Sequence, residues 1–179
     1  MKVRWYNIVK TLRAIVRNQE DILRNQRMIL ADQSLRRAID KLKVHGVALT
    51  PDMLPHWDGR FEVCTRRIGD LRSKSPSLGI VPFRESRLYR FLVSQDVREF
   101  DAYRKDIGEM LGYRPESSGW DQEFLTLAKR MKEEPYDISK CAIVILDGSN
   151  VVIDGNHRVA ALLVAHGEDY EIQVVKLFG

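Results

Sequence analysis

The chain has 179 residues, of which 44% are hydrophobic and 30% are charged, which suits one folded domain with an appendage. A formal net charge of +4 is too small to indicate a dedicated nucleic-acid binder. Cys64 and Cys141 lack the spacing of a metal or redox motif, so we expect both to be reduced thiols. The first 30 residues hold no long apolar run, so neither a secretory signal nor a spanning helix is expected, and the predicted location is cytoplasmic.

Residues 1–43 are predicted to form one long helix, since no glycine or proline occurs among them. Two similar heptads, RNQEDIL and RNQRMIL, follow each other, and Ile15, Ile22 and Ile29 recur every seven residues. This repeat is typical of a coiled coil, and the glutamines at alternate seam positions favour a fixed register. We therefore expect a homo-oligomer through residues 1–43. The alternative is an amphipathic helix packed on the chain's own domain.

The start of this helix also has features of a membrane-surface segment. Lys2 and Arg4 lie beside Trp5 and Tyr6. Basic and aromatic side chains together favour the interface of an anionic membrane. Peripheral contact with a membrane surface is therefore a further alternative.

Residues 44–79 are predicted to be a linker. They contain Pro51, Pro55 and Pro76, and the run SKSPS around Pro76 has the composition of an exposed loop. The folded domain is therefore expected to begin near residue 80.

Residues 80–179 show strand and helix patterns in turn. A short strand is predicted at 80–83. Apolar residues at helical spacing then predict a helix over 86–113 and a second over 121–134.

The C-terminal part continues with a hairpin, a helix and a strand. The apolar runs at 142–146 and 151–153 flank Asp147-Gly148, a pair that favours a tight turn. A helix over 156–166 and a strand over 172–177 follow. The predicted fold class is α+β, a small mixed sheet with flanking helices, preceded by the long N-terminal helix.

The candidate site lies in the segment DGNHR, where a buried strand gives way to a helix. Gly155 allows a sharp turn and a close approach of a ligand to the main chain, and Asn156 suits the N-cap. The free amides of the first helical turn favour a bound phosphate.

Three ionisable side chains accompany this turn. His157 and Arg158 can donate to phosphate oxygens, and cations at the positive end of a helix indicate an anion that offsets their repulsion. Asp154 could hold a metal ion or orient a hydroxyl. The alternative is ordinary turn chemistry with side chains that face solvent. The combination predicts metal-assisted phosphoryl transfer.

These residues resemble the ParB/sulfiredoxin superfamily, whose fold has a short strand, helices, a hairpin with a G-x-H-R-like signature, a helix and a closing strand. The resemblance covers residues 80–178, and its specific part is residues 136–177. It implies binding of ATP, ADP or CTP through Gly155, Asn156, His157 and Arg158.

The branches of this superfamily differ at telling positions. Sulfiredoxin has a catalytic cysteine where this chain has Asn156, and ParB proteins carry a helix-turn-helix domain for which no pattern follows here. Free serine kinases carry D-G-H-H-R, and this chain matches four of the five positions. The similarity implies Mg²⁺-dependent phosphorylation of a hydroxyl, with Asp154 and His157 as catalytic groups.

In the free serine kinase branch, a glutamate after the first strand is the general base. Glu85 is the nearest candidate, with a surface or capping role as the alternative. Arg84 and Arg87 could hold an anionic substrate.

The sequence thus predicts an ATP-dependent, or CTP-dependent, kinase that acts on a hydroxyl of a small molecule or a glycan. The Tyr-Asp…Asp-Gly-x-His-Arg run is also similar to that of modules of bacterial surface-glycan synthesis, and this similarity implies a peripheral location at the inner membrane. The alternative is a non-catalytic nucleotide-binding switch that controls assembly of the coiled coil. A nucleic-acid partner is not expected.

Overall fold

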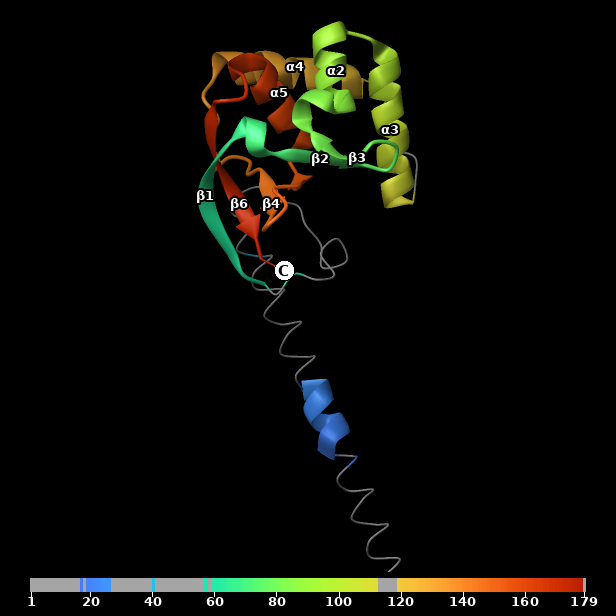
Figure 1. Cartoon of the computed structure of the whole chain (residues 1–179), viewed down its shortest axis with the longest axis vertical. Helices are drawn as coiled ribbons and strands as arrows, with labels where there is room; N and C mark the ends of the chain where they lie inside the picture. Colours follow the sequence, from blue (N-terminus) through green and yellow to red (C-terminus); the bar gives the residue numbers. More distant parts are fainter. Residues whose placement is uncertain are drawn as a thin grey trace, which may run out of the picture.

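The structure is a computed structural model that describes residues 17, 19–26, 40, 57, 59–112 and 119–178. In this part of the chain, a small mixed sheet and a group of helices form the main domain (Figure 1). The predicted α+β class is therefore confirmed.

Four strands make the main sheet, in the order β1-β6-β4-β5. β1 (Phe61–Arg67) pairs antiparallel with β6 (Glu171–Leu177). β6 pairs parallel with β4 (Val144–Leu146), which pairs antiparallel with β5 (Val152–Asp154). The three strands that were predicted in the C-terminal part are confirmed, with small shifts at their ends.

The predicted linker is wrong for its second half, because β1, the 3-10 helix η2 (Ile68–Asp70) and β2 (Arg72–Ser75) lie in it. β1 has no fully buried side chain, so the alternating pattern that marks a half-buried strand is missing from it. Pairing with β6, which lies about a hundred residues later, makes this segment a strand. Residues 44–56 and 58 lie outside the described residues.

Both faces of the central strands are buried. Ile145 and Val174 pack against the helices, whereas Val144 and Val175 belong to a second cluster with Trp57 on the other face. Successive side chains of a strand point to opposite faces, so a strand buried on both sides is apolar at every position. This is why the sequence of β4 is continuously apolar.

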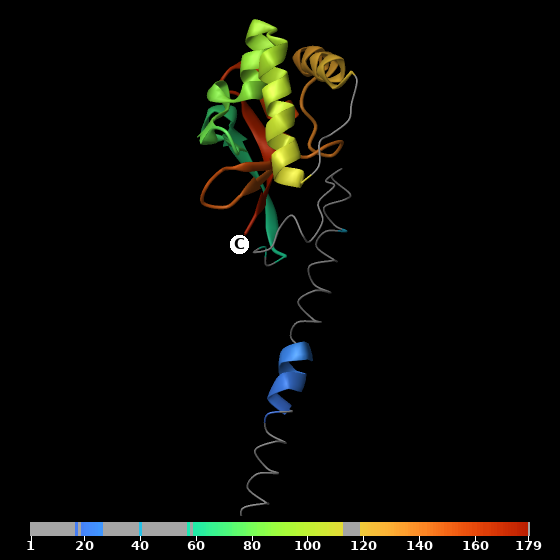
Figure 2. The same cartoon turned by 90° about the vertical axis from the view of Figure 1, so that its right-hand side faces the viewer.

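The helices of the described domain share one hydrophobic core with one face of the sheet. They are α2 (Arg87–Ser94), α3 (Val97–Leu111), α4 (Trp120–Glu133) and α5 (Asn156–His166). α5 contacts both α2 and α4, and α2 and α3 run side by side (Figure 2). The predictions of α4 and α5 are confirmed.

The single helix predicted over 86–113 is wrong, because it is two helices. Gln95 adopts a left-handed conformation with φ of 57° and ends α2. Asp96 then caps α3, since its carboxylate accepts a hydrogen bond from the backbone N–H of Arg98 at 3.0 Å. No glycine or proline marks this break in the sequence.

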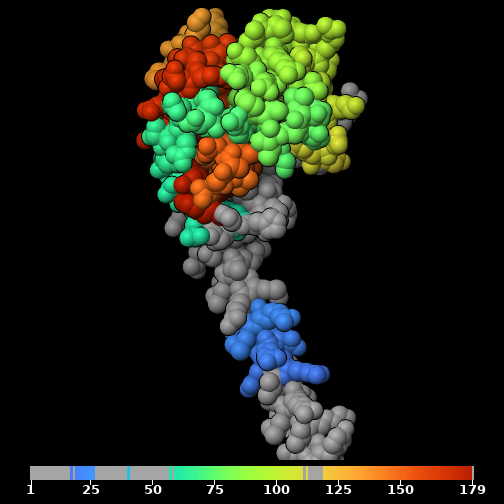
Figure 3. Space-filling view, viewed as in Figure 1, coloured from blue at the N-terminus to red at the C-terminus, as the bar shows by residue number. Residues whose placement is uncertain are grey.

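A separate two-stranded sheet, β2 with β3 (Gly79–Pro82), forms a hairpin beside the main sheet. An isolated bridge between Arg72 and Val151 joins it to the segment that connects β4 and β5. In Figure 3 the orange surface of that segment lies next to the green surface of this part of the chain. The 3-10 helix η3 (Phe83–Glu85) follows β3 and leads into α2.

The β4–β5 connection extends beyond the Asp147-Gly148 pair that predicted a tight turn. Residues 147–150 form the loop, and the N–H of Leu146 donates to the carbonyl oxygen of Val151 at 3.0 Å. Gly148 and Asn150 both have a positive φ, of 74° and 52°. Asparagine tolerates this conformation better than most residues, so Asn150 can close the longer loop.

Within the predicted N-terminal helix, the structure describes residues 17, 19–26 and 40, and residues 19–26 are helical. Their side chains are exposed, including Ile22 and Leu23. The remaining part of the predicted coiled coil, with its basic and aromatic start, lies outside the described residues. Among the described residues, no helix has both the length and the apolar character needed to cross a membrane.

Candidate functional site

A cavity of about 710 Å³ lies where β5 leads into α5, and we call it the α5 cavity. Its size falls within the range of small-molecule sites, about 300–1,000 Å³. Apolar side chains such as Leu78, Val81 and Ile107 line part of it. Its polar lining consists of Ser73, Lys74, Ser75, Ser86, Arg87, Tyr103, Asp106, Asp154, Asn156 and His157.

The floor of the cavity depends on the backbone at Gly155. This residue has φ of 92°, and a Cβ atom there would lie 2.9 Å from Cγ1 and 3.1 Å from Cα of Ile143. Only glycine fits both the left-handed conformation and the close contact. The turn brings Asp154 and Asn156 together at the cavity.

The first turn of α5 opens on the α5 cavity. Gly155 is the N-cap and offers no side chain to the amides, so the prediction of Asn156 as the N-cap is wrong by one residue. Asn156 is instead the first helical residue and lines the cavity. The first N–H groups of a helix have no partner inside the helix, and here no side chain caps them in the described structure.

His157 lines the cavity but is not the cation that the sequence suggested. Its ring makes edge contacts with the rings of Phe124, Tyr103 and Trp120, at centroid distances of 4.8, 5.2 and 6.1 Å. Burial, followed by the charge of Arg158, lowers the pKa of His157 from 6.5 to about 4. The imidazole is therefore neutral at pH 7, and it can donate or accept a hydrogen bond without charge.

Arg158 is not among the described residues that line the cavity. Its Nη1 donates a hydrogen bond to the carbonyl oxygen of Ala142 at 3.3 Å, so the guanidinium contacts the segment before β4. The structure thus brings Asp154, Asn156 and His157 together and leaves Arg158 outside this group.

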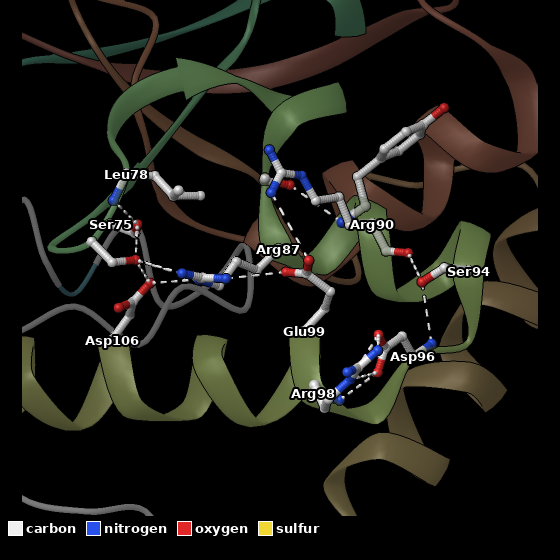
Figure 4. Close-up of polar contacts among 12 residues, drawn as sticks. Ser75, Leu78, Arg87, Arg90, Ser94, Asp96, Arg98, Glu99 and Asp106 are labelled. Carbon is white, nitrogen blue, oxygen red and sulfur yellow. Dashed lines mark hydrogen bonds and ion pairs between the residues drawn. The ribbon is translucent and has the colours of Figure 1, made fainter.

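Arg87 lines the cavity, but its guanidinium is already engaged (Figure 4). It donates from Nη1 to Glu99 at 3.1 Å, from Nε to Asp106 at 3.4 Å and from Nη2 to Ser77 at 3.2 Å. The Ser77 hydroxyl also donates to Asp106 at 2.7 Å. Two carboxylates balance Arg87, so it links α2, α3 and the β2–β3 turn rather than presenting a free charge to a substrate.

Arg84 and Glu85 lie in η3, are exposed, and are not among the described cavity residues. Arg84 forms an ion pair with Glu168 at 3.5 Å. The structure therefore brings neither residue to the cavity, although Arg84 was predicted to contact the substrate and Glu85 to be the base.

A resident magnesium site does not fit the residues present. No group of three or more potential ligands from His, Cys, Asp and Glu occurs among the described residues. Of the two carboxylates that line the cavity, Asp106 is held by Ser77 and Arg87, and only Asp154 is left without such a partner in the described chain. One carboxylate is too few for a protein-built site.

Most of the polar lining of the cavity was missed by the sequence reasoning, including Lys74 and Tyr103. Lys74 lies in β2, a segment taken as part of the linker, and it is exposed at the cavity. Tyr103 was interpreted only as an apolar position of a helix. The helical spacing around Tyr103 could have indicated which side of α3 is buried, but neither residue has a motif that marks it.

Comparisons with known proteins name no family and no function for this chain. No protein-family model, no curated protein and no solved structure matches the chain. The chemistry of the α5 cavity therefore has to carry the functional interpretation.

Proposed function

We propose that the chain binds a nucleotide in the α5 cavity and transfers a phosphoryl group from it to a hydroxyl of a small molecule or a glycan. The observation that carries the proposal is the uncapped first turn of α5 at a cavity of about 710 Å³. Unpaired amides and the positive end of the helix dipole both favour phosphate oxygens.

The remaining lining of the cavity is compatible with this ligand. Lys74 supplies a cation at the cavity, and no ion pair of its ammonium group is found within the described structure. Asn156 can donate to a phosphate oxygen from its amide. Leu78, Val81 and Ile107 provide an apolar wall on which a planar base could pack.

The order of elements also supports the proposal. From β3 onward the chain runs through helices, the β4–β5 hairpin, α5 and the closing β6. This is the order that the resemblance to ParB/sulfiredoxin-like proteins implies, with the signature residues at the turn into α5. Arg158 departs from that expectation, because its guanidinium contacts Ala142 instead of the cavity.

Nucleotide binding can be tested with Asn156→Asp. The carboxylate is nearly isosteric and favours the N-terminus of a helix, so the fold should be retained, but it places a negative charge where we expect the phosphates. We expect the dissociation constants of MgATP and MgCTP, measured by titration calorimetry, to rise at least about tenfold, which corresponds to about 1.4 kcal/mol.

Asn150→Asp is the matched control. It makes the same change of charge in the 147–150 loop, at a residue that is not part of the α5 cavity. Equal effects of the two substitutions, or a wild-type chain that binds neither nucleotide, would refute the proposal.

A second candidate is a nucleotide-binding switch without catalysis. It is favoured by the position of Glu85, which leaves the cavity without the carboxylate base that the resemblance implies. In that case nucleotide binds, no phosphoryl group is transferred, and the oligomeric state of the full chain changes with nucleotide. Light scattering with and without nucleotide, together with a turnover assay, separates the two candidates.

A further inference from the structure

Transfer of a phosphoryl group to a hydroxyl requires a group that takes the hydroxyl proton. Glu85 does not line the cavity, and Asp106 is paired with Arg87. We propose that His157 accepts this proton and that the hydroxyl of Tyr103 positions the acceptor by a hydrogen bond. This inference rests on the proposed function. Neither role follows from the resemblance, which makes His157 a catalytic group that binds phosphate, assigns the proton to a glutamate and gives Tyr103 no role.

The ring of His157 is fixed by packing rather than by hydrogen bonds. It meets Phe124 and Tyr103 nearly edge-on, at interplanar angles of 82° and 89°, and Trp120 at 69°. Within the described structure, neither ring nitrogen has a hydrogen-bond partner, although the residue lines the cavity. A ring nitrogen is therefore available to a ligand, and the three aromatic neighbours restrict the orientation of the ring.

Tyr103 brings a second polar group to the same place. It lies on α3 and lines the cavity, and its hydroxyl makes no hydrogen bond in the described part of the chain. Burial, followed by the negative charge of Asp154, raises the pKa of Tyr103, so the phenol keeps its proton and can donate it in a hydrogen bond. Because this residue lines the cavity, its hydroxyl is open to a ligand there, and an acceptor hydroxyl could take part in a hydrogen bond with it.

The charges around His157 make its basicity depend on the ligand. Burial and then the charge of Arg158 hold its pKa at about 4 in the free protein, which is low for a general base at neutral pH. Phosphates bound at the first turn of α5 would add negative charge beside the ring and raise its pKa toward neutrality. The other ionisable groups that line the same cavity are Lys74, Arg87, Tyr103, Asp106 and Asp154.

The reaction step balances with a nucleoside triphosphate as the donor. The acceptor oxygen forms a bond to the γ-phosphorus while the bond from that phosphorus to the β–γ bridging oxygen breaks. The bond's electron pair leaves with the nucleoside diphosphate. The hydroxyl proton passes to the free nitrogen of His157 and then to water, and Tyr103 keeps its proton throughout.

The full chain can be assayed with MgATP and a pool of monosaccharides, glycerol and serine, with release of ADP and mass shifts of the pool as readouts. His157→Gln keeps a polar side chain that cannot titrate, and we expect it to lower kcat at least about a hundredfold and to remove the acid limb of the pH profile.

Tyr103→Phe removes only the hydroxyl and should raise the KM of the acceptor about tenfold. Both variants should keep the affinity for MgATP within a few-fold of the wild type.

Tyr89→Phe is the control, because Tyr89 packs on the core outside the cavity. Turnover by His157→Gln at the wild-type rate, with an unchanged pH profile, would overturn this inference and leave the proposed function standing. A wild-type chain that binds MgATP without turnover would overturn this inference together with the proposed phosphoryl transfer, and would leave the nucleotide-binding switch as the function. A wild-type chain that does not bind nucleotide overturns both.

A measurement on the wild-type chain avoids any dependence on the folding of the variants. The pKa of His157 is followed by NMR of its imidazole C–H group, without nucleotide and with a non-hydrolysable ATP analogue. We expect the analogue to raise this pKa by at least one unit. A pKa that does not change when the analogue binds would overturn the role of His157 as a base that nucleotide activates.

Discussion

Gly155 meets two separate requirements, a left-handed backbone and a close approach to Ile143. Its φ of 92° is unfavourable for any residue with a Cβ atom, and its Cα faces the side chain and backbone of Ile143 at close range. By contrast, open space lies where a Cβ atom would be at five other glycines with a positive φ, namely Gly79, Gly112, Gly119, Gly148 and Gly167. The tight contact with Ile143 holds the start of α5 against the residue that precedes β4, and this fixes the floor of the cavity.

Gly155→Ala should therefore destabilise the domain more than Gly148→Ala. The left-handed conformation alone accounts for about 1–2 kcal/mol in both variants, and overpacking against Ile143 adds about 1–3 kcal/mol at position 155. Urea unfolding followed by circular dichroism gives both free energies of unfolding. Equal losses in the two variants would show that the contact with Ile143 can relax without penalty.

His157 makes the stability of the domain depend on pH. Its pKa is about 4 in the folded chain and about 6.5 when unfolded, so the unfolded chain binds more protons between these values. The stability that the domain gains from a neutral His157 is fully present above pH 6.5 and is lost as the pH falls toward 4. The ring keeps some exposure to the cavity, so we expect a loss on the order of 1–2 kcal/mol between pH 7 and pH 5.

His157→Gln removes this titrating group, and its free energy of unfolding should fall less between pH 7 and pH 5 than that of the wild type. Urea unfolding at the two pH values measures the difference. Parallel pH dependence of wild type and variant would mean that the imidazole titrates normally in the folded chain.

Among the elements, the β2–β3 hairpin forms one wall of the cavity and lies outside the main sheet. Apart from the bridge between Arg72 and Val151, its turn is held by Ser77, which donates to Asp106 on α3 at 2.7 Å. Arg87 at the start of α2 donates to both residues. Three elements that are separate in the sequence therefore meet at one carboxylate that is only 5% exposed.

Asp106→Asn should cost about 2 kcal/mol of unfolding free energy, because it weakens charge-assisted hydrogen bonds and leaves Arg87 with Glu99 as its remaining carboxylate partner. Asp101→Asn is the control, since Asp101 is exposed and pairs with Arg104 of its own helix at 3.7 Å. The control should change stability by less than about 0.5 kcal/mol. A comparable loss in both variants, measured by urea unfolding, would contradict the special role of Asp106.

At the scale of the whole molecule, the N-terminal repeat is the feature that the domain does not explain. In the single chain Ile22 and Leu23 are 49% and 54% exposed on residues 19–26, which are helical. Two adjacent large apolar side chains on an exposed helix favour burial against another helix. We propose that a second copy of the repeat covers them.

Ile22→Glu should lower the oligomeric state of the full chain, because a charge in a coiled-coil seam disfavours association. Arg24→Glu places the same side chain two residues further along the repeat, away from the seam, and should have little effect. Size-exclusion chromatography with light scattering measures both. A wild-type chain that is monomeric at every concentration, or equal effects of the two substitutions, would exclude this seam.

Local sequence determined those parts of the protein whose pattern is complete within one segment. The run AIVIL, the turn DGNHR and the apolar helix after it predicted β4, the left-handed Gly155 and α5, because continuous burial and a glycine turn each have a local signal. The same signals located Asp154, Asn156 and His157 at one site.

Tertiary structure alone decided what depends on partners far away in the chain. β1 is a strand because β6 pairs with it, and Lys74 and Tyr103 reach the cavity because a hairpin and α3 enclose it. The state of His157 was decided in the same way, since rings from α3 and α4 bury the imidazole and make it neutral. A local pattern gives a residue's position on its own element, whereas burial and charge come from the elements that pack around it.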